Sequence, residues 1–253
     1  TTTQAAKLEG LDLSKMTTAA VNAITSAAFG AIDPSQIGQL GSTQVTALTG
    51  DQVKALTTAQ AVQLTASQTP GLTTAQASSL EDADLAALTT GAFEKISPDV
   101  LSKLSSTQMG SLTTAQIVAL TTAQAAALTT AQSVGITTTQ APKLEDADLK
   151  VLTTTAFAAM TPEAAAVLTG AQVTALRGEE IKALTTAQMP FLSGEQVAGL
   201  TTAQVAVLAT QQIASLTGDQ VAAIEVTDLR VMSNAQIGAF TVDQIPSMTG
   251  DQV

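Results

Sequence analysis

The stretch Leu112–Gly135 reads LTTAQIVA-LTTAQAAA-LTTAQSVG, an eight-residue word written three times. The same period extends in both directions: every residue whose number is a multiple of eight, from Leu8 to Met248, is Leu, Ile, Met or Phe. We call these residues the leucine column. The residues five places further on, such as Ile117, form a second apolar column. The consensus octad is L-T-x-x-Q-[VIA]-x-A, and a strict period of this kind predicts an array in which each repeat packs on its neighbours.

Each octad has the signals of one very short helix. Thr directly after the leucine column and Gln three residues later form a capping-box pattern, in which both side chains bind backbone N–H groups at a helix start. Twenty of the 21 acidic residues lie in the first half of an octad and nine of the ten basic residues lie near its end, as the helix dipole favours. Two sets of prolines agree: the first falls at the first helical position, and the second, six residues after the leucine column, limits the helix to about one turn, partly 3₁₀. These sets are Pro34, Pro98 and Pro162, and Pro70, Pro142, Pro190 and Pro246.

The fold class predicted from this pattern is all-α, a repeat solenoid with one short capped helix per octad. One continuous helix is excluded, since apolar spacings of five and three average four per turn instead of about 3.6. A β-solenoid is the alternative, although the leucine column breaks the alternation that a strand requires. We expect both apolar columns to point inward, and Thr, Gln and the charged side chains to lie at corners or outside. The number of octads in one turn of the solenoid stays open.

Residues 1–253 are expected to form a single continuous array. Both ends are in register with the octads and lack the atypical polar repeats that usually cap a solenoid, so we expect either a fragment of a longer chain or an array that flanking subunits cap.

Two octads depart from the consensus in the same way. These acidic words are LEDADLAA, which begins at Leu80, and LEDADLKV, which begins at Leu144; LEGLDLSK at Leu8 and IEVTDLRV at Ile224 are related. Carboxylate oxygens are Ca²⁺ ligands, although EF-hand spacing is absent. The alternative is a carboxylate-rich first turn of a helix, with Asp in place of the capping Gln. The candidate metal ligands are Glu81, Asp82, Asp84, Glu145, Asp146 and Asp148.

Composition narrows the class of function. The net charge of −11 disfavours nucleic acid and anionic membranes as partners. The sequence contains no Cys and no His, so it offers no disulfide, no thiolate and no imidazole, and enzyme activity is not expected. No cofactor other than Ca²⁺ is indicated, and no apolar run has the length of a membrane span.

The chain is similar to the low-complexity Thr/Ala/Gln octapeptide arrays of large secreted or surface proteins of bacteria. This resemblance implies export and a structural role at the cell surface or outside the cell, as a subunit of a filament, sheath or surface layer, or as the stalk of an adhesin. We expect end-to-end association with itself or with neighbouring repeats. One alternative is a solenoid binding module for a protein, a polysaccharide or Ca²⁺; another is an ice-binding ladder of paired threonines.

Overall fold

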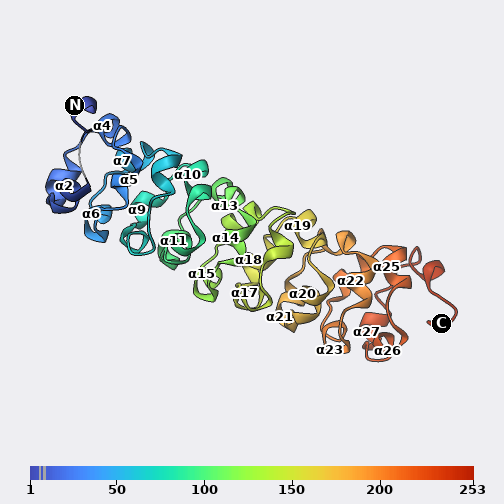
Figure 1. Cartoon of the computed structure of the whole chain (residues 1–253). Coiled ribbons are helices and arrows are strands. Elements are labelled where there is room, and N and C mark those ends of the chain that lie inside the picture. Colours follow the sequence, from blue (N-terminus) through green and yellow to red (C-terminus); the bar gives the residue numbers. More distant parts are fainter. Residues whose placement is uncertain (6, 8–9) are drawn as a thin grey trace. The chain divides into compact units, whose positions relative to one another are not determined.

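The computed structural model describes residues 1–5, 7 and 10–253 (Figure 1). For residues 10–12 it describes the backbone and not the side chains. Throughout these ranges the chain forms short α-helices and 3₁₀-helices and no β-strand, which confirms the all-α solenoid over the β alternative. The residues form two compact units, 1–128 and 129–253, and each unit is described by itself. Leu8 and Glu9 of the first related word lie outside the described residues.

The first unit contains α1 (Thr2–Ala5), α2 (Gly10–Lys15), α3 (Thr18–Asn22), α4 (Ser26–Gly30), α5 (Pro34–Ile37), α6 (Ser42–Thr46), α7 (Gly50–Lys54), α8 (Thr58–Ala61), η1 (Thr69–Gly71), α9 (Thr74–Ala77), α10 (Asp82–Ala87), α11 (Thr90–Glu94), α12 (Pro98–Leu101), α13 (Ser106–Ser111), α14 (Thr114–Val118) and α15 (Thr122–Ala126).

The second unit contains α16 (Thr130–Gly135), η2 (Ala141–Lys143), α17 (Asp146–Val151), α18 (Thr154–Ala158), α19 (Pro162–Ala166), α20 (Gly170–Ala175), α21 (Gly178–Ala183), η3 (Met189–Phe191), α22 (Gly194–Ala198), α23 (Thr202–Val205), α24 (Thr210–Ala214), α25 (Gly218–Ala222), α26 (Val226–Leu229), α27 (Asn234–Ile237) and η4 (Ile245–Ser247).

The predicted capping box starts many of these helices, whereas others, such as α10 and α17, begin without it. In α14, the Thr113 hydroxyl accepts the backbone N–H of Gln116 at 3.2 Å, and the Gln116 Oε1 accepts the backbone N–H of Thr113 at 2.9 Å. Both proline predictions are confirmed. One set of prolines opens α5, α12 and α19. The other set occupies the four 3₁₀-helices η1 to η4, where a missing N–H shortens the turn without breaking a longer helix.

Each helix packs against the helix of the third octad along the chain, as α4 does on α7 and α11 on α14 in the first unit, and α18 on α21 in the second. Side-chain hydrogen bonds reach further back: the amide of Gln52 contacts carbonyls 31 and 28 residues earlier, in the fourth and third preceding octads. One turn of the solenoid within each unit therefore contains between three and four octads.

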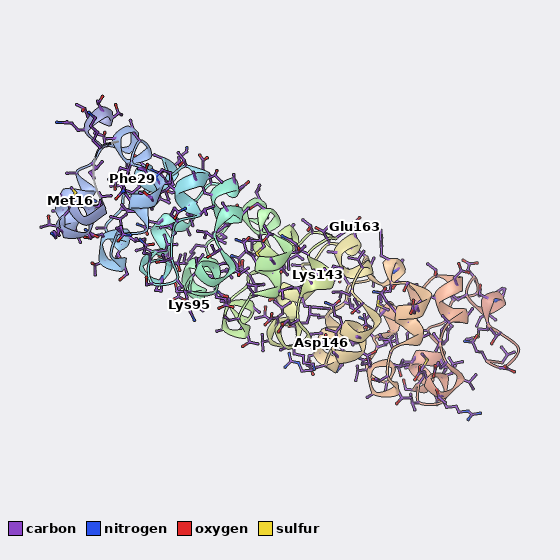
Figure 2. The ribbon with its side chains drawn as sticks, viewed as in Figure 1. Met16, Phe29, Lys95, Lys143, Asp146 and Glu163 are labelled. Atoms are coloured by element: carbon purple, nitrogen blue, oxygen red, sulfur yellow. The ribbon has the colours of Figure 1, made fainter. Side chains whose placement is uncertain are left out.

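The two apolar columns form the core, as expected. Ile117 is fully buried and Leu120 is 5% exposed, and the three phenylalanines of the second apolar column, Phe29, Phe93 and Phe157, are buried as well. Burying a leucine side chain contributes about 1.5–3 kcal/mol, so these columns supply much of the stability that a one-turn helix lacks by itself. Charged side chains such as Lys95, Asp146 and Glu163 lie at the surface (Figure 2).

The placement of glutamine at corners or outside was wrong. We call the residues four places after the leucine column the glutamine column. Its glutamines are buried from Gln44 to Gln244, as Gln60 and Gln116 show with exposures of 0% and 1%. The physical reason is that helix capping occupies only the Oε1 atom, which leaves two amide N–H donors to be satisfied. The preceding turn supplies their acceptors, and one octad of sequence carries no sign of that turn.

Candidate functional site

The regular feature that unites the solenoid is a series of glutamine side chains, which we call the glutamine ladder. In Gln52, Oε1 accepts the N–H of Thr49 at 2.8 Å, while Nε2 donates to the carbonyls of Val21 at 2.8 Å and Ile24 at 2.7 Å. Nε2 contacts with the preceding turn recur at Gln44, Gln60, Gln68, Gln76, Gln108, Gln116 and Gln124 in the first unit, and at Gln172, Gln188, Gln196, Gln204, Gln212, Gln220, Gln236, Gln244 and Gln252 in the second.

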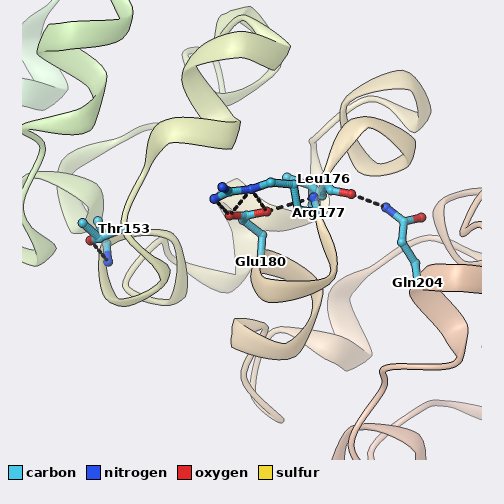
Figure 3. Close-up of polar contacts among 6 residues, drawn as sticks. Thr153, Leu176, Arg177, Glu180 and Gln204 are labelled. Carbon is cyan, nitrogen blue, oxygen red and sulfur yellow. Dashed lines mark hydrogen bonds and ion pairs between the residues drawn. The ribbon is translucent and has the colours of Figure 1, made fainter.

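Each ladder glutamine joins a helix start to the preceding turn. Figure 3 shows one of these contacts, in which Gln204 donates to the carbonyl of Leu176 at 2.8 Å. Because these amides are buried, their hydrogen bonds have little competition from water, and each carbonyl would be costly to leave without a donor. The ladder therefore fixes the register between successive turns.

The structure places the predicted Ca²⁺ ligands at the first turns of α10 and α17. Glu81 and Glu145 occupy the N-cap positions and are exposed, and Asp82 and Asp146 follow them at the helix start. Asp84 and Asp148 point inward, with 3% and 1% exposure. Within each word the outer and inner carboxylates therefore separate. In the part of the chain that the structure describes, no three acidic side chains are placed together so that they could hold a metal ion.

The inward aspartates occupy the glutamine column, and their carboxylates lack the amide donors of the ladder. Asp84 Oδ2, Asp228 Oδ2 and both carboxylate oxygens of Asp148 are buried without a hydrogen-bond partner. Burial raises the pKa of Asp84, the charge of Glu81 adds to that effect, and the hydroxyl of Thr58 opposes it. Burial and the charge of Glu145 raise the pKa of Asp148 to about 6. Burial raises the pKa of Asp228 as well.

Glu180 is a second kind of acid in the glutamine column, and sequence reasoning missed it. Its side chain is fully buried, and Oε2 retains the capping contact by accepting the N–H of Arg177 at 2.8 Å. The Arg177 guanidinium forms an ion pair with the same carboxylate (Figure 3). A signal was present in the sequence: Arg177 is the single basic residue in the first half of an octad, three places before a Glu that replaces the consensus Gln.

Comparison with known families supports the repeat character of the chain. The model of the ALTTAQ repeat family matches residues 5–42, 141–177 and 221–253. No curated protein and no solved structure matches the chain. Among the described residues, none of the helices combines the length and the apolar character needed to cross a membrane.

Proposed function

We propose that this repeat protein is a structural scaffold rather than a catalyst. The observation that carries the proposal is the glutamine ladder, in which the same cap within an octad and the same Nε2 contacts with the preceding turn recur along each unit. The same contact recurs at Gln60, Gln116 and Gln204. An array of this kind can be lengthened by adding further turns, as a structural scaffold requires. The absence of His and Cys from the sequence agrees with a non-catalytic role.

We further propose that the scaffold acts at the cell surface or outside the cell, in a filament, sheath or surface layer or as the stalk of an adhesin. The resemblance to octapeptide arrays of bacterial surface proteins supports this location, and the acidic, cysteine-free composition is compatible with it. The proposed partners are further repeats joined end to end, because a turn that is held by the ladder can be followed by another of the same kind.

Immunogold electron microscopy of intact producing cells, with antibody raised against residues 1–253, tests the location and the assembly together. The expected result is gold label on surface filaments, a surface lattice or thin stalks, and loss of the label after brief treatment of intact cells with protease. Label confined to the cell interior would contradict the surface proposal. Negative-stain images of the purified chain are the companion measurement: filaments or a lattice support self-assembly, whereas monodisperse particles at all concentrations contradict it.

A further inference from the structure

One junction between turns in the first unit lacks the glutamine ladder. Three successive residues of the glutamine column are Asp84, Ala92 and Val100, and the ladder resumes at Gln108. Because one turn contains between three and four octads, these replacements remove the glutamine ties along almost a full turn. We call the junction between residues 49–72 and residues 81–104 the bare junction.

Other contacts hold the bare junction together. Helix α10 packs on α8, and η1 approaches the next turn through the buried hydroxyl of Thr69, which donates to the carbonyl of Ala92 at 2.7 Å. Ala92 and Phe93 are fully buried, and Val100 is 2% exposed. Apolar packing therefore replaces the ladder at this junction, together with a side-chain hydrogen bond that runs from the earlier turn to the later one. Asp84 is the buried titratable residue of the junction.

The surroundings of Asp84 provide hardly any positive charge. Its helix carries Glu81 at the N-cap and Asp82 at the helix start, and these charges oppose the ionised form of Asp84. The helices packed against it, α8 and α13, have no charged residue, and α8 contributes only the Thr58 hydroxyl. The nearby helix α7 carries Asp51 and Lys54, both of which are exposed to solvent.

At the ladder register, the residues 31 and 28 places before Asp84 are Val53 and Leu56. Their counterparts one octad earlier, Val45 and Leu48, accept the Nε2 of Gln76 at 2.9 and 2.7 Å. An ionised aspartate has no hydrogen to donate, whereas a protonated carboxyl has one O–H donor. Ionised Asp84 is therefore a charged group that can only accept hydrogen bonds, and it stands where a ladder glutamine would donate its Nε2 hydrogens to the preceding turn.

We propose that the bare junction is an acid-sensitive joint, which protonation of Asp84 tightens and ionisation loosens, while stretches that have only glutamine in the glutamine column, such as residues 105–128, are unaffected. Burial raises the pKa of Asp84 above its ordinary 3.8. The folded state consequently binds the proton more tightly than the unfolded state, and the stability of the joint falls as the pH rises from about 3.8 through the raised value. The residues 64 places after Asp84, Ala92 and Val100 form a similar set, Asp148, Ala156 and Ala164.

Hydrogen–deuterium exchange of the full 253-residue chain tests the joint, with protection factors corrected for the intrinsic pH dependence of exchange. As the pH falls from about 7.5 to just below 3.8, the ordinary pKa of an aspartate, we expect the amides of residues 53–64 and 81–88 to gain more protection than those of the ladder-tied residues 105–128. Asp84→Gln should abolish this gain by raising protection at the higher pH, because it restores the consensus donor.

Two further variants separate charge from shape. Asp84→Asn removes the charge and is shorter than glutamine, so it should also abolish the pH dependence while giving less protection than Asp84→Gln. Asp99→Asn removes an exposed carboxylate from α12 in the same turn, and it should leave the gain intact. The proposal is overturned if the wild-type chain shows no selective gain, if Asp84→Gln retains it, or if Asp99→Asn abolishes it as well.

Discussion

The side-chain amide of Gln116 donates to the backbone carbonyl of Leu85, 31 residues earlier, at 2.8 Å, and to that of Leu88 at 3.0 Å. This relationship sets the length of a turn, because the side chain reaches both carbonyls only when the intervening octads complete the winding. The same residue caps its own helix through Oε1. One buried amide thus links local helix formation to long-range packing.

Gln116→Ala is expected to destabilise the first unit by about 2–4 kcal/mol, because it leaves a buried N–H and two carbonyls without this partner. Gln63→Ala is the matched control, since Gln63 is exposed and lies outside the ladder; it should change stability by no more than about 0.5 kcal/mol. Urea unfolding followed by circular dichroism measures both. Equal effects of the two variants would show that the ladder contributes little.

The local structure could be predicted from the sequence because each of its causes lies within eight residues. Thr113 and Gln116 identify the helix start, Pro98 and Pro70 set helix limits, and the multiples of eight identify the core. Turn length could not be predicted in this way, because it depends on acceptors about thirty residues away, such as the carbonyl of Leu85. The burial of Asp84 could not be predicted for the same reason, since it is decided by the preceding turn.

Leu120→Asp is expected to disrupt the array locally, at a cost of about 4 kcal/mol or more, because it removes an apolar contact and buries an unpaired charge. Leu120 is 5% exposed, whereas Val118, two residues earlier, is 47% exposed. Val118→Asp therefore introduces the same charge at the surface and should be nearly neutral. Protection from hydrogen exchange around α12 and α15, which pack on each other, is the measurement. Similar losses in both variants would contradict the inward placement of the leucine column.

Arg177→Thr is expected to destabilise the second unit, because it removes the counter-charge of the buried Glu180 carboxylate. Adding Glu180→Gln should restore stability to the wild-type level or above, since the double variant has the consensus T-x-x-Q capping box and a neutral amide facing the preceding turn. Thermal unfolding of the two single variants and the double variant forms a double-mutant cycle. Additive effects would mean that the two residues do not act as a pair.

Asp148→Asn should remove part of the pH dependence of stability. The folded-state pKa of Asp148 is about 6 against an ordinary 3.8. Because the folded form binds the proton more tightly, the contribution of this group is greatest below about pH 3.8, falls between that pH and about 6, and stays low above it.

The shift in the pKa of Asp148 corresponds to roughly 3 kcal/mol, so Asp148→Asn is expected to stabilise the chain by up to about that amount at neutral pH and to change it little near pH 4. Asp146→Asn is the control, because Asp146 is exposed on the same helix and its replacement removes the same charge. Urea unfolding of the three proteins across this pH range distinguishes them. If Asp146→Asn flattens the pH profile as much as Asp148→Asn does, net charge and not the buried carboxylate controls the response, and the inward aspartates have no special part in it.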